Sequence, residues 1–245
     1  GMMGVLAGKP LVLHEQNSVA GMANKVLAGV ADRVFTAFPN VFKQGQWVGN
    51  PLRTPFTQQP GPAERFAGRT GPLRLLVVGG SLGARALNEI VPKAIALMPA
   101  DQRPQVIHQS GATQIDALRA NYAAAGVEAE CTPFIDDTAS AFAAADIVVC
   151  RSGASTVTEI AAVGAAALFV PFPSAVDDHQ TTNARFLVDA GGGWLVQQRD
   201  LTPEGLSQML LKLERPALVD IALKAKNMQK INATREVVTA CEELA

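Results

Sequence analysis

The stretch "LRLLVVGGSLGARAL", residues 73–87, decides the fold. Apart from Arg74, residues 73–78 are apolar, as expected for a strand that is buried on both faces of a parallel sheet. Gly79, Gly80 and Gly83 predict a tight turn, and residues 84–97 have the apolar spacing of a helix. A strand, a glycine turn and a helix in this order predict a βα unit of a Rossmann-like, doubly wound α/β sheet.

The same alternation continues on both sides of this unit. Strands are expected at residues 11–13, 33–37, 105–108, 128–131, 147–150, 167–170 and 194–196. Helices are expected at residues 19–30, 113–125, 138–145, 156–163 and 179–190, and throughout the tail after Thr202. Strands that alternate with helices predict right-handed βαβ crossovers and an open parallel sheet.

Composition predicts a division of the chain into four parts. Residues 73–225 carry enough strands and helices for a complete domain, and residues 226–245 should form a C-terminal helix. Prolines and glycines between residues 51 and 72 indicate a linker. Residues 1–50, with two expected strands and one helix, bury too little surface to fold alone, so we expect them to be the remnant of a preceding α/β domain. Because position 1 is not methionine, we also expect a piece of a longer protein.

The totals exclude several classes of partner. The 21 basic and 22 acidic residues give a net charge of −1, and no Lys/Arg tract is present, so we expect no nucleic-acid partner. No stretch approaches the ~20 apolar residues of a membrane-spanning helix, so any membrane contact should be peripheral. The three cysteines, 131, 150 and 241, lack metal spacing and fit a reducing compartment. The two Asp-Asp pairs are not specific either, and we infer no metal and no cofactor.

The glycine turn should present backbone N–H groups and a positive helix end to an anion at the carboxyl edge of the sheet. Ser81 adds a hydroxyl donor there. The turn lacks the Lys-Ser/Thr of a P-loop and the G-x-G-x-x-G spacing, and the next strand ends in His108-Gln109 rather than an acid, which disfavours a nicotinamide dinucleotide. A diphosphate without nicotinamide is favoured, and a tight turn without any ligand stays open.

A second stretch, "CRSGASTVTEIAA" at residues 150–162, allows two interpretations. Thr156 and Glu159 fit a capping box, in which both side chains bond backbone amides at a helix start. Alternatively, Glu159 faces the same crevice as the glycine turn and accepts two hydrogen bonds from a vicinal diol such as a ribose. Serine hydrolysis is disfavoured because G-x-S-x-G is missing. The polar loop at residues 177–183 should lie at the same edge, unless it is only a solvated helix start capped by Asp178.

Together these segments closely resemble the MurG family, the UDP-N-acetylglucosamine transferases of bacterial cell-wall synthesis. The matching segments, in the family's order, are residues 14–17, 49–53, 79–84, 134–137, 150–159 and 177–184. The resemblance implies a GT-B fold, two Rossmann-like domains that face each other across a cleft. It also implies transfer of N-acetylglucosamine from UDP to the C4 hydroxyl of the muramoyl sugar of lipid I, giving lipid II. The reaction inverts the anomeric configuration, needs no metal, and is expected at the cytoplasmic face of the bacterial inner membrane.

The resemblance also implies roles for single residues. Arg53 and Ile135 should lie by the uracil, Ser81 by the diphosphate and Glu159 by the ribose hydroxyls. The remaining substrate-binding residues that it implies are Ala154, Ser155 and Thr156 along the nucleotide, His179 and Gln180 at the N-acetylglucosamine hydroxyls, and Asn17 on the acceptor side.

The sequence departs from the family pattern at its start. The family's first glycine-rich loop, which is expected to bind the acceptor diphosphate and to supply the candidate base, is absent, as is most of the expected membrane-docking surface. We therefore assign no catalytic base and expect this polypeptide alone to bind UDP-N-acetylglucosamine with little turnover.

Two alternatives stay open. One is a donor-binding subunit that a partner chain completes, although such a subunit should begin near residue 60. The other is a UDP-sugar epimerase of similar fold, which UDP release dependent on a muramoyl acceptor would exclude.

Overall fold

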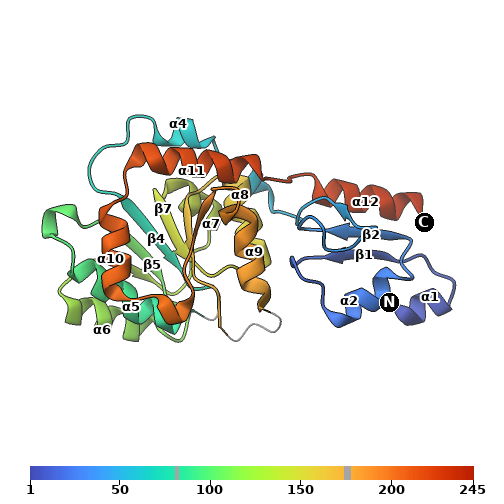
Figure 1. Ribbon diagram of the computed structural model, residues 1–245, viewed down its shortest axis with the longest axis horizontal. Coiled ribbons are helices and arrows are strands. Elements are labelled where there is room, and N and C mark those ends of the chain that lie inside the picture. The colour runs from blue at the N-terminus through green and yellow to red at the C-terminus, as the bar shows by residue number, and fades with distance from the viewer. Residues whose placement is uncertain (81–82, 174–177) are drawn as a thin grey trace.

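The computed structural model describes residues 1–80, 83–173 and 178–245, and it contains two parallel sheets (Figure 1). The larger sheet has the order β6-β5-β4-β7-β8-β9. Its strands are β4 (Arg74–Val78), β5 (Gln105–Gln109), β6 (Glu130–Thr132), β7 (Ile147–Cys150), β8 (Ala167–Phe169) and β9 (Gly193–Leu195). Chain order reverses between β4 and β7, which makes this pair the switch point of a doubly wound sheet.

Register brings the strand ends of the larger sheet together. Val78, at the end of β4, lies opposite Gln109 of β5 and Cys150 of β7. Because all the pairs are parallel, the loops after β4, β5 and β7 leave from one edge, the carboxyl edge.

Helices cover both faces of this sheet. One face packs against α5 (Arg85–Ala96), α6 (Ile115–Ala125) and α10 (Pro203–Leu211). The other packs against α7 (Thr138–Ala144), α8 (Ala154–Val163) and α9 (His179–Val188), while α11 (Arg215–Asn227) contributes Leu218 and Ala225 to the two faces. All four residues of β7 are buried, as its apolar sequence predicts for a central strand.

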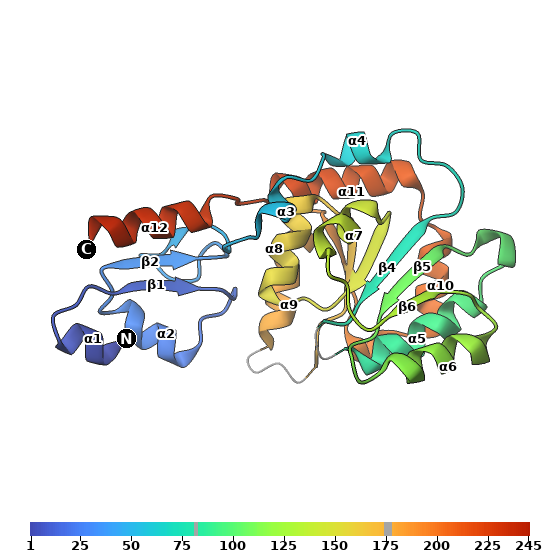
Figure 2. The same ribbon diagram turned by 180° about the vertical axis from the view of Figure 1, so that it is seen from behind.

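The smaller unit contains β1 (Val12–Glu15), β2 (Arg33–Thr36) and β3 (Gln46–Trp47) in that order. Helices α1 (Met2–Leu6) and α2 (Met22–Ala28) lie on one side of it, and α12 (Ala233–Glu243) returns to the other (Figure 1, Figure 2). Ala233 and Ala240 of α12 form a buried cluster with Phe35 and Val48. Both ends of the chain therefore lie in the smaller unit. Residues 1–50 hold one strand and one helix more than expected, β3 and α1.

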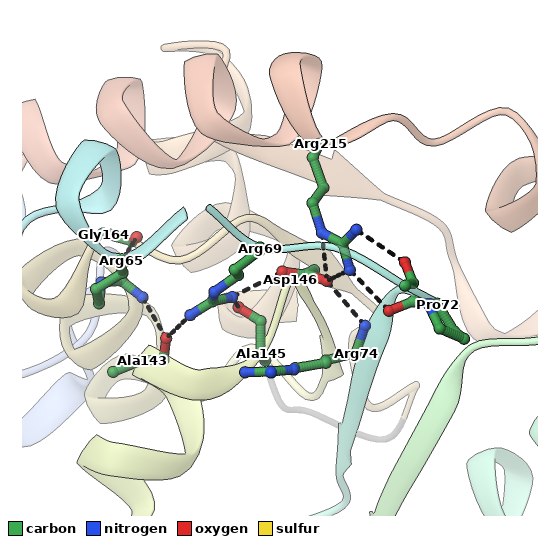
Figure 3. Close-up of polar contacts among 10 residues, drawn as sticks. Arg65, Arg69, Pro72, Arg74, Ala143, Ala145, Asp146, Gly164 and Arg215 are labelled. Carbon is green, nitrogen blue, oxygen red and sulfur yellow. Dashed lines mark hydrogen bonds and ion pairs between the residues drawn. The ribbon is translucent and has the colours of Figure 1, made fainter. Parts of the chain in front are cut away.

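The segment 51–72, expected to be a linker, contains two short helices, α3 (Thr54–Thr57) and α4 (Pro62–Phe66). It is fixed to the larger unit by two arginines (Figure 3). Arg65 donates to the carbonyls of Ala143 (2.8 Å) and Val163 (3.1 Å), and Arg69 donates to Ala143 (2.8 Å) and to the Asp146 carboxylate (2.7 Å).

Asp146 is the centre of this attachment. Its buried carboxylate also accepts from the Arg74 amide at 2.9 Å and the Arg215 guanidinium at 2.9 Å (Figure 3). Burial alone would raise the pKa of the Asp146 carboxyl, but the hydrogen bonds from Arg69, Arg74 and Arg215 hold it below its usual value. This cluster lies at the amino ends of β4 and β7, so it stabilises the edge opposite the carboxyl edge.

Candidate functional site

Two loops flank the switch point at the carboxyl edge. Gly79 and Gly80 follow β4, and residues 151–153 follow β7. Gly80 and Gly83 have φ angles of 83° and 75°, in the left-handed region that favours glycine. Ser81, expected at the diphosphate, lies outside the described residues, as does Asp177 of the later loop. An open α/β sheet binds its ligands at such a crevice.

Helix α8 begins at this carboxyl edge, shortly after β7. It begins at Ala154 after Gly153, so the capping box expected at Thr156 is wrong: Thr156 is the third residue of the helix. The pattern was misleading because the N-cap lies three residues earlier, at Gly153, which has no side-chain hydrogen bond to the helix. The backbone N–H groups of Ala154, Ser155 and Thr156 lie in the first turn, where an α-helix supplies them no internal partner.

Glu159 lies one turn further along α8 and is mostly buried. Burial raises the pKa of its carboxyl to about 7, and the positive charge of Arg53 opposes that rise. Arg53 is the N-cap residue of α3, and its guanidinium lies over the Phe56 ring, 5.1 Å from the centroid. The fold thus brings together two predicted site residues that are 106 positions apart (159 − 53).

The loop after β6 approaches the same guanidinium. Asp137 caps α7 by accepting from the Ser140 amide at 3.0 Å. Hydrogen bonding from the Ser140 side chain, and then from its amide, lowers the pKa of the Asp137 carboxyl, and the charge of Arg53 adds to the effect. Ile135, two residues earlier, is half-buried against the core cluster that includes Ala154 and Val157. Arg53 is therefore close enough to Asp137 and Glu159 to act on the pKa of both, and Ile135 packs against the cluster to which α8 contributes.

Gln180 and His179 begin α9. The Gln180 Oε1 accepts from the Phe172 amide at 2.9 Å, which fixes the side chain against the end of the β8 loop. Asp178 stands at the N-cap position with a left-handed φ of 49°, but its carboxylate accepts from the Thr181 hydroxyl (2.7 Å) instead of capping the backbone. Asp178 therefore occupies the cap position of the alternative interpretation, but without a side-chain hydrogen bond to the backbone of α9.

Asn17 contacts α9 across the two units. Its Oδ1 accepts from the Nδ2 of Asn183 at 3.3 Å. Asn183 is fully buried, and its Oδ1 accepts from the amide (2.9 Å) and hydroxyl (2.7 Å) of Ser18. Sequence reasoning gave Asn183 no role. The available signal was its position four residues before the buried Leu187, where a helix face should be apolar.

Two further polar groups were also missed. Gln109 Oε1 and Ser152 Oγ are buried and have no hydrogen-bond partner among the described residues. Gln109 is the last residue of β5, and Ser152 is the second residue after β7, so both lie at the carboxyl edge. Arg151, beside Ser152, donates to the carbonyls of Val170 and Pro171 at 3.0 and 3.1 Å and so fixes the end of β8.

A cavity of about 970 Å³ lies at the other edge, lined among others by Arg74, Gln105, Ala145 and Glu130. It contains none of the predicted site residues. It is formed at the amino ends of β4 to β6, whereas ligands of open α/β sheets bind at the carboxyl ends, so we place the site in the crevice.

The described ranges contain neither a cluster of metal ligands nor a membrane-spanning helix. Within them, no three His, Cys, Asp or Glu side chains converge as metal ligands would. None of the helices in the same ranges is both long enough and apolar enough to cross a membrane.

Known proteins are similar to this chain in sequence and in fold. Residues 74–241 match the model of the glycosyltransferase family 28 C-terminal domain. The crystal structure of Acinetobacter baumannii MurG superposes with a TM-score of 0.88 and 41% identity, over 99% of this chain and 69% of that chain. The chain belongs to the MurG family.

Curated relatives in the MurG family are closely similar in sequence. The UDP-N-acetylglucosamine–N-acetylmuramyl-(pentapeptide) pyrophosphoryl-undecaprenol N-acetylglucosamine transferase of Paracidovorax citrulli is 77% identical over all of this chain and 69% of its own length. The enzyme of the same name from Polaromonas sp. is 76% identical over all of this chain and 63% of its own length. The chain therefore spans about two thirds of these relatives. Membership confirms the expected GT-B fold and identifies a glycosyltransferase.

Proposed function

We propose that this chain carries the donor-binding half of an inverting transferase that moves N-acetylglucosamine from UDP-N-acetylglucosamine to the C4 hydroxyl of lipid I, giving lipid II. The names of the relatives at 76–77% identity support this reaction. The observation that carries it is the start of α8 at the switch point, with the mostly buried Glu159 one turn inside the helix and within the electrostatic influence of Arg53.

The crevice suits a uridine nucleotide. The Glu159 carboxylate can accept from both ribose hydroxyls, because an ionised carboxylate offers two acceptor oxygens. Arg53 and Ile135 flank the uracil, and Ala154, Ser155 and Thr156 present the first-turn amides of α8. We place the diphosphate at the glycine turn, with Ser81 as a donor.

The same arrangement supports departure of UDP. Negative charge grows on the diphosphate as the glycosidic bond breaks, and helix N-termini aimed at that charge stabilise it without reorganising. In this proposal, backbone amides stabilise the departing UDP, and no metal-binding residues are assigned. Gln180, with its Oε1 held by the Phe172 amide, directs its NH2 group elsewhere, and we assign it and His179 to the sugar hydroxyls.

The acceptor belongs to the other side of the cleft. We assign residues 1–50 to that side, with Asn17 facing lipid I, residues 51–72 to the connection and residues 73–225 to the donor domain. The donor, lipid I and a peripheral contact with the cytoplasmic face of the inner membrane are the partners that this proposal requires. It assigns no catalytic base to the chain.

Calorimetric titration with UDP tests the donor site. Glu159→Ala should weaken UDP binding by about 1.5–3 kcal/mol, since it removes charge-assisted hydrogen bonds to the ribose. Arg53→Ala should weaken both UDP and uridine without changing the thermal midpoint, because its side chain is exposed. Glu128→Ala, an exposed carboxylate before β6, is the matched control and should bind normally. Unchanged UDP affinity in the Glu159 variant contradicts the assignment, and sugar conversion without a muramoyl acceptor would indicate an epimerase.

A further inference from the structure

A chain of buried polar side chains runs beneath the glycine turn. The Tyr122 hydroxyl lies 2.9 Å from Nδ1 of His108, and Nε2 of His108 lies 3.0 Å from Oδ1 of Asn88. Tyr122, His108 and Asn88 are 3%, 0% and 2% exposed. They come from α6, β5 and α5, three elements that pack together on one face of the larger sheet.

The hydrogen bonds define one protonation state. The Nδ2 of Asn88 donates to the Ser110 carbonyl (3.3 Å) and to Oε1 of Gln114 (2.9 Å), so its Oδ1 must accept. His108 therefore donates from Nε2 and accepts the Tyr122 proton at Nδ1. Burial lowers the pKa of His108 to about 3, which keeps the ring neutral at physiological pH.

This chain ends at the wall that supports the glycine turn. Gly83 packs so closely on Ser110 and Gln114 that a Cβ there would lie 2.0 Å from the Ser110 carbonyl oxygen and 3.0 Å from Nε2 of Gln114. The amide of Gly83 donates to the Gly80 carbonyl at 2.9 Å, so the position of Gly83 is coupled to that of Gly80. Asn88 orients both groups of the wall.

We propose that His108 and Tyr122 are positioning residues for the donor diphosphate, acting through Asn88 on the position of Gly83, where the glycine turn ends. The inference rests on the proposed function, in which that turn faces the diphosphate. Neither side chain is a candidate to touch the substrate, because both are buried in the core. Burying three polar side chains costs desolvation free energy that apolar side chains would avoid. Packing alone therefore does not explain why these three residues are polar.

The test compares two ligands, UDP and uridine, by NMR titration of the full chain. His108→Leu removes the donor to Asn88 and should weaken UDP binding about tenfold, the equivalent of one lost buried hydrogen bond, while uridine binding stays within about twofold. Tyr122→Phe should show the same selectivity with a smaller loss. His108→Gln should restore UDP binding, since its amide can donate to Asn88 and accept from Tyr122.

Each outcome decides the inference. Variants that keep the parental UDP-to-uridine affinity ratio, or that lose both ligands equally, overturn it. If His108→Leu fails to fold, Tyr122→Phe, which removes only one oxygen, gives the decision. A parent chain that binds UDP no better than uridine overturns the proposed function and this inference with it.

Discussion

At the scale of single residues, Glu159 links the site to stability. The raised pKa of about 7, compared with an ordinary value of 4.5, means that the folded chain prefers the protonated carboxyl. The contribution of the protonated Glu159 carboxyl to folding stability is fully present below about pH 4.5 and is lost as the pH rises through 7. Glu159→Gln, which stays neutral, should therefore exceed the parent in stability by about 1–3 kcal/mol at pH 8.5 and by much less at pH 5.

Urea unfolding at the two pH values measures this difference. Glu128→Gln, an exposed carboxylate, is the control and should change stability equally little at both. A pH-independent gain for Glu159→Gln would mean that its carboxyl does not titrate as the burial requires.

Sequence reasoning at this scale was limited by the start of α8. The Thr-x-x-Glu pattern of residues 156–159 fits a capping box, but the pattern does not say where a helix begins. Gly153 and Ala154 set that start, and Glu159 therefore lies in the second turn of α8 and takes no part in a capping box. Asn183 could not be assigned because its partner Ser18 lies 165 positions away.

At the scale of elements, the two cations at the end of α8 are the main feature. Arg65 and Lys226 both donate to carbonyls of its last turn, which a helix leaves without internal partners. Arg65 also bonds the carbonyl of Ala143 at the end of α7. Burial lowers the pKa of Arg65 to about 10, so it stays charged at neutral pH.

Arg65→Ala should lower the free energy of unfolding by about 2–4 kcal/mol, because it removes the guanidinium that donates to the buried carbonyls of Val163 and Gly164. Arg74→Ala is the matched control: its side chain is exposed and it bonds Asp146 through its backbone amide. Urea unfolding followed by circular dichroism compares the two. A loss for Arg65→Ala no larger than that for Arg74→Ala would contradict the capping role.

The elements themselves differ in how far the sequence predicts them. The strand at residues 147–150 agrees residue by residue, because a central strand shows as an uninterrupted apolar run. The strand β3 has only two residues, Gln46 and Trp47, and gives no periodic signal. The segment 51–72 reads as a linker since its order depends on Arg65 and Arg69, whose partners lie more than 70 positions away.

At the scale of the whole molecule, aromatic packing and α12 add to the contacts that Asn17 and Ser18 make between the two units. Phe186 of α9 packs edge-on against Phe38 and Trp47, with ring centroids 5.2 and 5.8 Å apart. The chain also returns through α12, whose Ala240 is buried against the smaller sheet. The sequence predicted a C-terminal helix but not its partner, because a short amphipathic helix can pack on either unit.

Ala240→Asp separates the roles of the two units. A carboxylate buried beside Phe35 and Val48 is costly, so α12 should detach and residues 1–50 should become the first site of limited proteolysis. Thr239→Asp, exposed on the same helix, is the control and should leave cleavage unchanged. UDP affinity should stay within about twofold in both variants, since distant changes act independently.

The unchanged UDP affinity is expected because of the position of Arg53. Arg53 belongs to the segment that Arg65 and Arg69 fix to the larger unit, and Glu159 lies on α8 of the same unit. Detaching α12 therefore leaves both nucleotide contacts in place. If Ala240→Asp weakens UDP binding as strongly as Glu159→Ala does, the donor site depends on the smaller unit, and the assignment of UDP binding to residues 51–225 fails.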